Sequence, residues 1–157
     1  MSVAFRRDGD DEHLEPKFEI PIPPGPNLVT ARGLALIGEK LAALEVELAA
    51  KLADAGEEAQ INAVKRQLRY WTTRQITAEL VPAPDGSVVA IGTRVSFTLN
   101  GKRRDLAIVG DDEADPAQGS IAFSAPLARA LIGGEEGEFL PFNGKEDALE
   151  VLEIAVI

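Results

Sequence analysis

The chain has 157 residues, 45% of them hydrophobic and 27% charged, so it is long and apolar enough to form a folded core. It has no cysteine and one histidine, His13, which excludes disulfides and cysteine nucleophiles and nearly excludes histidine triads and multi-histidine metal sites. The net charge is −10, and no apolar run fits a membrane span or a signal peptide. We therefore expect a soluble cytoplasmic protein with no membrane partner.

Residues 1–26 are expected to form a flexible, acidic and proline-rich arm. Residues 1–27 carry six acidic and three basic side chains, and four prolines fall within residues 21–26. Repeated prolines remove backbone donors and fix an extended φ, which disfavours both helix and sheet.

Residues 27–82 are predicted to form an antiparallel coiled coil. Thr30 is a suitable N-cap for the first helix. Apolar residues then recur in steps of three and four, which is the pattern of a coiled-coil seam. In the first helix they are Leu34, Ile37, Leu41, Leu44 and Leu48, and in the second Ile61, Val64, Leu68 and Trp71. With about 25 residues in each arm, the hairpin should be roughly 37 Å long.

The turn between the two helices contains the acidic residues Asp54, Glu57 and Glu58. Gly56 suits the left-handed position that ends a helix. Asp54 and Glu57 have the spacing of a capping box, and acidic residues favour the start of a helix. Helix capping is therefore the simplest interpretation of these carboxylates, and a role directed at a metal ion is the alternative.

The second helix carries a basic strip on an otherwise acidic protein. Between residues 59 and 78 there is no carboxylate, and the strip consists of Lys65, Arg66, Arg69 and Arg74. Two interpretations stay open: a solvated helix face that keeps the hairpin soluble, or a surface that contacts RNA phosphates or an acidic channel wall.

The C-terminal half, residues 86–157, is predicted to be a small antiparallel sheet with one short helix. Strands are expected over residues 88–91, 94–99, 103–109, 120–123, 138–142 and 149–157. Asn100-Gly101 is a strong signal for a two-residue hairpin turn. The helix should run over residues 126–132, with Pro126 at its first position, and stop at Gly133-Gly134. The fold class is therefore α+β.

Three stretches resemble a known family. The first is residues 27–34 (Asn-Leu-Val-Thr-Ala-Arg-Gly-Leu), which resemble a Thr-x-x-Gly-x-x-x-Leu entry into a coiled coil. The other two are residues 108–116 (Ile-Val-Gly-Asp-Asp-Glu-Ala-Asp-Pro) and residues 124–133 (Ser-Ala-Pro-Leu-Ala-Arg-Ala-Leu-Ile-Gly). Together they resemble the GreA/GreB family of bacterial transcript cleavage and elongation factors. The resemblance implies that residues 86–157 form an FKBP-like domain. It does not extend to residues 1–26.

The resemblance implies a partner and a mode of action. The C-terminal domain is expected to bind RNA polymerase at the rim of its secondary channel, and the coiled coil to enter the channel and meet the RNA 3′ end indirectly. The expected polymerase-binding residues come from the second and third stretches: Asp112, Glu113, Asp115, Ser124, Pro126, Leu127 and Arg129. The acidic loop, residues 111–115, is too irregular for a calcium-binding loop and is expected to be a turn closed by Pro116 and Gly119.

The same resemblance gives the tip carboxylates a role. In cleaving members, acidic tip residues help to hold a Mg²⁺ ion of the polymerase active site and a water molecule, so that the polymerase hydrolyses backtracked RNA. Asp54, Glu57 and Glu58 are the candidates here. The chain is then an accessory factor, not an enzyme, with no cofactor or metal of its own.

Two departures from the family pattern keep alternatives open. The tip lacks the family's Gly-Asp-Leu-Ser-Glu-Asn-Ala-Glu-Tyr pattern, and the arms are expected to be one to two heptads shorter, a loss of roughly 10–20 Å of reach. Ser124-Ala125-Pro126 also stands where Asp-Ser-Pro or Asn-Ser-Pro is expected. A non-cleaving competitor for the channel, similar to the regulator of nucleoside diphosphate kinase, is the first alternative.

Further alternatives concern chemistry and assembly. An FKBP-type prolyl isomerase would need an aromatic pocket, for which the sheet offers Phe97, Phe123, Phe139 and Phe142. The seam could also pair between chains, although we expect a monomer. Because the basic strip lies within an acidic protein, we expect weak or no binding to free DNA.

Overall fold

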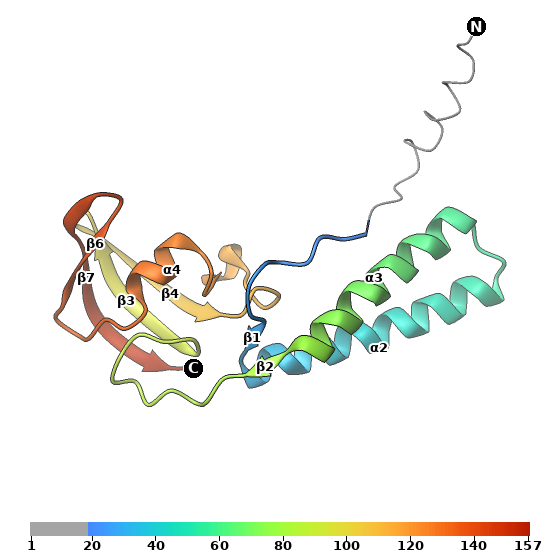
Figure 1. Cartoon of the computed structure of the whole chain (residues 1–157), viewed down its shortest axis with the longest axis horizontal. Coiled ribbons are helices and arrows are strands. Elements are labelled where there is room, and N and C mark those ends of the chain that lie inside the picture. The colour runs from blue at the N-terminus through green and yellow to red at the C-terminus, as the bar shows by residue number, and fades with distance from the viewer. Residues whose placement is uncertain (1–18) are drawn as a thin grey trace, which may run out of the picture.

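The computed structural model describes residues 19–157 as a helical hairpin joined to a five-stranded sheet (Figure 1). The arm expected over residues 1–26 therefore lies outside the described residues as far as residue 18. The hairpin and its base consist of β1 (Leu28–Val29), α2 (Ala31–Ala53), α3 (Glu58–Thr77) and β2 (Glu79–Leu80). The sheet region consists of β3 (Thr93–Leu99), β4 (Lys102–Val109), the 3-10 helix η1 (Pro116–Gln118), β5 (Ser120–Ala122), α4 (Pro126–Leu131), β6 (Phe139–Phe142) and β7 (Lys145–Val156). The expected fold class is confirmed.

The hairpin forms where the apolar spacing predicts it. Thr30 caps α2 by accepting a hydrogen bond from the Gly33 N–H. Ile37, Leu44 and Val64 are buried along the seam, and the other predicted seam residues are half-buried. Helices of 23 and 20 residues give a rod of about 30–35 Å.

The turn at the tip differs from the prediction in one residue. Ala55, not Gly56, adopts the left-handed conformation, with φ of 52°. The N–H groups of Gly56 and Ala55 bond back to the carbonyls of Lys51 and Leu52, which is the Schellman pattern of a helix end. Gly56 is favoured for a different reason: a Cβ there would lie 3.1 Å from the Lys51 carbonyl oxygen, which is closer than most Cβ contacts.

The five-stranded sheet has the order β5-β4-β3-β7-β6. Asn100 and Gly101, both with positive φ, close the predicted turn between β3 and β4. The pairs among β4, β3, β7 and β6 are antiparallel, but β4 and β5 are parallel, so the expectation of a purely antiparallel sheet was wrong at this edge. The reason is the connection: the chain crosses from the end of β4 through η1 before it returns as β5.

A second correction concerns residues 88–91, which were expected to form a strand. They form none, although Val89 is fully buried. Its backbone instead exchanges two hydrogen bonds with the glycines after α4: the Val89 N–H donates to Gly134, and the Gly133 N–H donates to Val89. A buried apolar run thus indicated the core correctly but not its partner.

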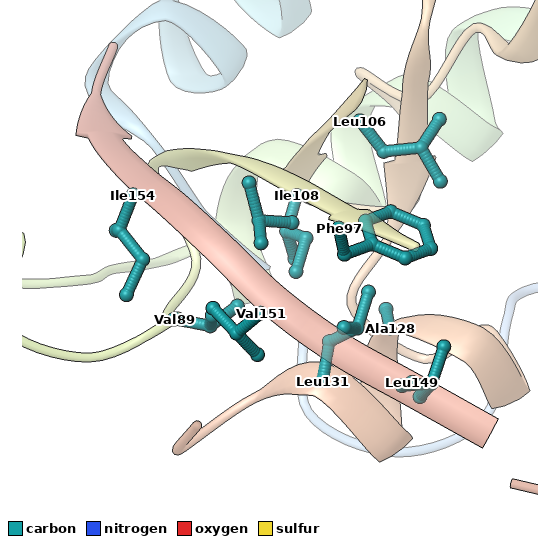
Figure 2. Packing of buried hydrophobic residues seen from close by; sticks show 10 residues of the cluster. Val89, Phe97, Leu106, Ile108, Ala128, Leu131, Leu149, Val151 and Ile154 are labelled. Carbon is teal, nitrogen blue, oxygen red and sulfur yellow. The ribbon is translucent and has the colours of Figure 1, made fainter. Parts of the chain in front are cut away.

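The core lies between one face of the sheet and α4 (Figure 2). Phe97 from β3 and Leu149 and Val151 from β7 face Ala128 and Leu131 of α4, and all five are fully buried. No helix of the described residues is long and apolar enough to cross a membrane.

The base of the hairpin is closed by a short parallel pair that the sequence did not indicate. Leu28 and Val29 of β1 pair with Glu79 and Leu80 of β2. The pair ties the entry of α2 to the exit of α3. In Figure 1 the hairpin extends away from this base, with its tip at the end remote from the sheet.

Candidate functional site

The tip carboxylates lie at the free end of the hairpin. Asp54, Glu57 and Glu58 are all exposed. Glu57 is the N-cap residue of α3 but makes no side-chain capping bond, and Asp54 is the C-cap of α2, so the predicted capping box does not form. Glu58 does lie in the first turn of α3, where its charge complements the helix dipole.

The basic strip divides into an exposed part and a buried part. Lys65 is exposed, Arg66 is partly exposed, and Arg69 has 56% of its side chain exposed. The side chain of Arg74 is only 2% exposed. The expectation that Arg74 belongs to a solvated or channel-facing strip was therefore wrong, because its charge is used inside the protein.

Arg74 connects the hairpin to the loop after β4. Its Nε donates to Asp112 Oδ2 at 2.6 Å, and its Nη2 donates to Asn27 Oδ1 at 2.8 Å. Asp111 adds a second carboxylate 3.9 Å from Nη2. Asn27 in turn donates to the Arg74 carbonyl, so side chain and backbone are both fixed. A buried ion pair of this kind needs such partners to offset the loss of hydration.

Tyr70 shares the carboxylate that Arg74 uses. Its hydroxyl donates to Asp112 Oδ1 at 2.5 Å. Burial, followed by the hydrogen bond to Asp112, raises the pKa of Tyr70 to about 12. The neutral phenol is therefore the form that this site stabilises.

A second contact, next to the first, joins the start of α2 to the same loop. The Thr30 hydroxyl accepts from Gly33 and donates to Glu113 Oε1 at 2.5 Å, while Arg32 Nη1 donates to Glu113 Oε2 at 2.9 Å. A Cβ on Gly33 would lie 2.8 Å from Glu113 Oε1, and one on Gly110 would lie 2.6 Å from the Leu28 carbonyl oxygen. Gly110 is thus needed for the close approach of the backbone, whereas a Cβ on Gly33 would displace the end of the Glu113 side chain. We use the name junction for two sets of contacts: those among Asn27, Tyr70, Arg74, Asp111 and Asp112, and those of Thr30 and Arg32 with Glu113.

The junction uses residues that the sequence suggested for another purpose. Asp112 and Glu113 were expected to face a polymerase, but their side chains are 10% and 4% exposed and bind the hairpin. The inward position of Arg74 could have been predicted from the sequence, because Arg74 stands three residues after the seam residue Trp71, on the same helix face. Its partner Asp112 is 38 residues away, a distance that periodicity does not bridge.

Of the other predicted binding residues, Ser124, Pro126, Leu127 and Arg129 lie at or near the start of α4, and Asp115 precedes η1. Asp115, Ser124, Pro126 and Arg129 are exposed, whereas Leu127 packs against the core. Ser124 Oγ donates to Asp111 Oδ1 at 2.5 Å, which joins this loop to the junction. The acidic loop does form a turn, followed by η1, which begins at Pro116 and is capped by Gly119.

Arg69 on the exposed strip is paired with the segment that leads into β1. Its Nε and Nη2 each donate to one carboxylate oxygen of Glu19, both at 2.8 Å. This two-pronged bond with Arg69 lowers the pKa of Glu19, and the charge of Arg66 contributes in the same direction. Among residues 19–157, no three side chains of the metal-binding types gather to hold an ion.

Known proteins resemble this chain in sequence. Residues 83–156 match the family model described as "Transcription elongation factor, GreA/GreB, C-term". Transcription elongation factor GreA of Helicobacter pylori (strain G27) is 34% identical over 125 residues, which cover 70% of this chain and 75% of that protein. GreA of Sinorhizobium medicae (strain WSM419) is 41% identical over 73 residues, 44% of this chain and 46% of that protein.

Among solved structures, the GreA factor homolog 1 (Gfh1) of Thermus thermophilus has 17% identity and a TM-score of 0.37, with 83% of this chain and 99% of that chain covered. The match to the Helicobacter pylori protein covers more of this chain than the family model does. The chain belongs to the GreA/GreB family of transcription elongation factors.

Proposed function

We propose that this protein is a Gre-like elongation factor that binds RNA polymerase at its secondary channel and inserts the hairpin tip toward the active site. The exposed residues around α4 provide the docking surface, and the junction sets the direction of the rod. The polymerase performs the chemistry, and this chain acts as an accessory factor in the cytoplasm.

We further propose that the tip stimulates cleavage of backtracked transcripts. The observation that carries this proposal is that Asp54, Glu57 and Glu58 are exposed and that the predicted capping box, the simplest structural role for them, is not formed. Two or three exposed carboxylates bind Mg²⁺ only weakly by themselves, but they can complete the coordination of an ion that the polymerase already holds. The metal thus belongs to the polymerase, and the tip supplies negative charge and a position for water.

A second function is favoured by the length of the arms. Helices of 23 and 20 residues give a short rod, and a tip that stops before the metal cannot assist it. The protein would then occupy the channel and exclude true cleavage factors. Both functions require the same docking and the same junction, and they differ only at the tip.

The test is a transcript-cleavage assay on backtracked polymerase complexes. The intact protein should stimulate Mg²⁺-dependent cleavage, and Asp54→Ala, Glu57→Ala and Glu58→Ala should reduce that stimulation by about 10- to 100-fold, the usual cost of losing a metal-supporting carboxylate. Glu45→Ala is the matched control, because Glu45 is an exposed acid on α2 far from the tip in sequence. If the intact protein gives no cleavage but suppresses that of an added GreA, the competitor function replaces the first.

A prolyl isomerase activity is not supported by the sheet. Phe97, the central candidate for an aromatic pocket, is fully buried in the core. A largely apolar cleft of about 490 Å³ does lie beside the hairpin base, but it is lined by residues 80–84, Val156 and Ile157 among others, with no phenylalanine. We retain the expectation of a monomer with weak or no binding to free DNA.

A further inference from the structure

Traced backward from β1, the chain lies along α3 and approaches the tip. Asn27 bonds to Arg74 and Thr77 near the end of α3, and Glu19 bonds to Arg69, which lies farther from the sheet on the same helix. A hollow between this segment and α3 is lined by Glu19, Ile20, Ile22, Arg69, Tyr70 and Thr73. Figure 1 shows this stretch leaving β1 on the side of α3. Over residues 19–27 the chain therefore runs parallel to α3, with Glu19 at the end nearer the tip.

The sequence before Glu19 is opposite in charge to the part of α3 that lies between Arg69 and the tip. Residues 8–19, which we call the acidic segment, hold six acidic side chains and one lysine. Between residues 59 and 78 the second arm has no carboxylate, and Arg66 and Lys65 lie three and four residues before Arg69, on the same helix face. The charge of Arg66 already acts on Glu19.

The reach is sufficient. From Arg69 back to the start of α3 at Glu58 is about 16 Å along the helix. Residues 8–18, if extended, span up to about 36 Å. The acidic segment can therefore cover Lys65 and Arg66 without strain on the Glu19–Arg69 bond.

We propose that the acidic segment docks along α3 and covers Lys65, Arg66 and Arg69, so that it competes with any external polyanion for this face. The occupant is part of the same chain, held at one end by the bond between Glu19 and Arg69. This inference deepens the proposed function, on which its consequence rests: the face covered is the one that would meet RNA phosphates or the channel wall. The arm would then set how readily the hairpin exposes positive charge.

The docking is tested without polymerase. Because the chain has no cysteine, His13→Cys places one nitroxide label within the acidic segment and leaves its carboxylates intact. The label should broaden the amide signals around Lys65, Arg66 and Arg69 at about 0.01 M salt and release them at about 1 M, where the screening length falls from about 30 Å to about 3 Å. Ser87→Cys, labelled in the same way, is the control. Absence of this salt-sensitive broadening overturns the inference and leaves the proposed function standing.

The competition is tested with a single-stranded RNA of about 20 nucleotides as the polyanion. Glu12→Gln, Glu15→Gln and Glu19→Gln combined should bind it about three- to tenfold more tightly than the intact chain, because up to three ion pairs no longer oppose binding. Glu146→Gln, Asp147→Asn and Glu153→Gln combined change the total charge equally on exposed positions of β7. If both triple variants tighten binding alike, net charge explains the effect and competition is refuted. If docking and competition are both observed but the protein forms no complex with polymerase, the proposed function is wrong and this inference still stands.

Discussion

At the scale of single residues, Asp112 is the group on which the junction depends. It accepts from Arg74 on one oxygen and from Tyr70 on the other. The two donors differ in how they respond to pH, because a guanidinium keeps its proton throughout the accessible range and a phenol does not. Of the two donors, Tyr70 is therefore the one through which alkaline pH can reach this contact.

We predict that stability falls in alkaline solution through Tyr70. Its pKa in the folded protein is about 12, above the ordinary value near 10, so its contribution is complete below pH 10 and is lost as pH rises toward 12. Allowing for solvent screening of this partly exposed group, the loss is on the order of 1 kcal/mol. Urea unfolding of the intact protein and of Tyr70→Phe at pH 8 to 11 measures it. The two stability curves should converge as pH rises, and parallel curves would contradict the assignment.

Arg74 shows where reasoning from sequence reaches its limit at this scale. An arginine in a run without carboxylates indicates a solvated or anion-binding face, and that holds for Lys65 and Arg69, which are exposed. Arg74 is buried because a loop 38 residues later supplies Asp112. Long-range charge pairs of this kind carry no local pattern, whereas the N-cap Thr30 does and was predicted correctly.

At the scale of elements, the turn at the hairpin tip is closed by a residue that is not ideal for it. Ala55 has φ of 52°, a conformation that costs an alanine roughly 1–2 kcal/mol and a glycine almost nothing. Gly56 next to it has no positive φ but needs the space around the Lys51 carbonyl. Position 55 thus favours glycine because of its backbone conformation, and position 56 favours glycine because of the limited space.

Ala55→Gly should therefore stabilise the tip, by about 0.5–1 kcal/mol once the greater freedom of glycine in the unfolded chain is subtracted. Gly56→Ala should destabilise it, because its Cβ would lie 3.1 Å from the Lys51 carbonyl oxygen. Urea midpoints, together with hydrogen exchange at the end of α2, measure both changes. Stabilisation by Gly56→Ala would show that this turn is misassigned.

The elements that the sequence predicted best are those defined by local patterns. The seam spacing predicted both helices, and Asn100-Gly101 predicted the turn between β3 and β4. The parallel pairs β1–β2 and β4–β5 were missed, because each joins segments separated by other structure. Strand pairing of that kind depends on how the chain packs, not on its local sequence.

At the scale of the whole molecule, the proposed function requires the hairpin to be held in one direction. Among the contacts described above, the junction attaches it to the sheet region, whereas the β1–β2 pair closes only the hairpin's own base. Two of the three stretches that resemble the family meet there: Thr30 and Gly33 from one, and Gly110 and Glu113 from the other. This placement suggests that the family pattern preserves the attachment of the rod as well as any contact with a partner.

Arg74→Met tests this attachment. It leaves Asp111 and Asp112 partly buried without their counter-charge, and breaking a buried pair in this way costs about 3–5 kcal/mol. Combining it with Asp112→Asn should recover part of the loss, because one unpaired charge is removed. Urea unfolding measures both variants, and residual dipolar couplings of α2 and α3 against β3 and β7 measure the direction of the hairpin.

We expect the double variant to remain folded with its hairpin direction no longer fixed, and therefore to bind polymerase while losing its effect on backtracked complexes. A rod that swings freely spends little time with its tip at one point, so the loss should exceed what the remaining stability predicts. If the double variant keeps both the dipolar couplings and the full effect on transcription, the contacts of Thr30 and Arg32 with Glu113 suffice to orient the hairpin, and the Arg74–Asp112 pair serves stability only.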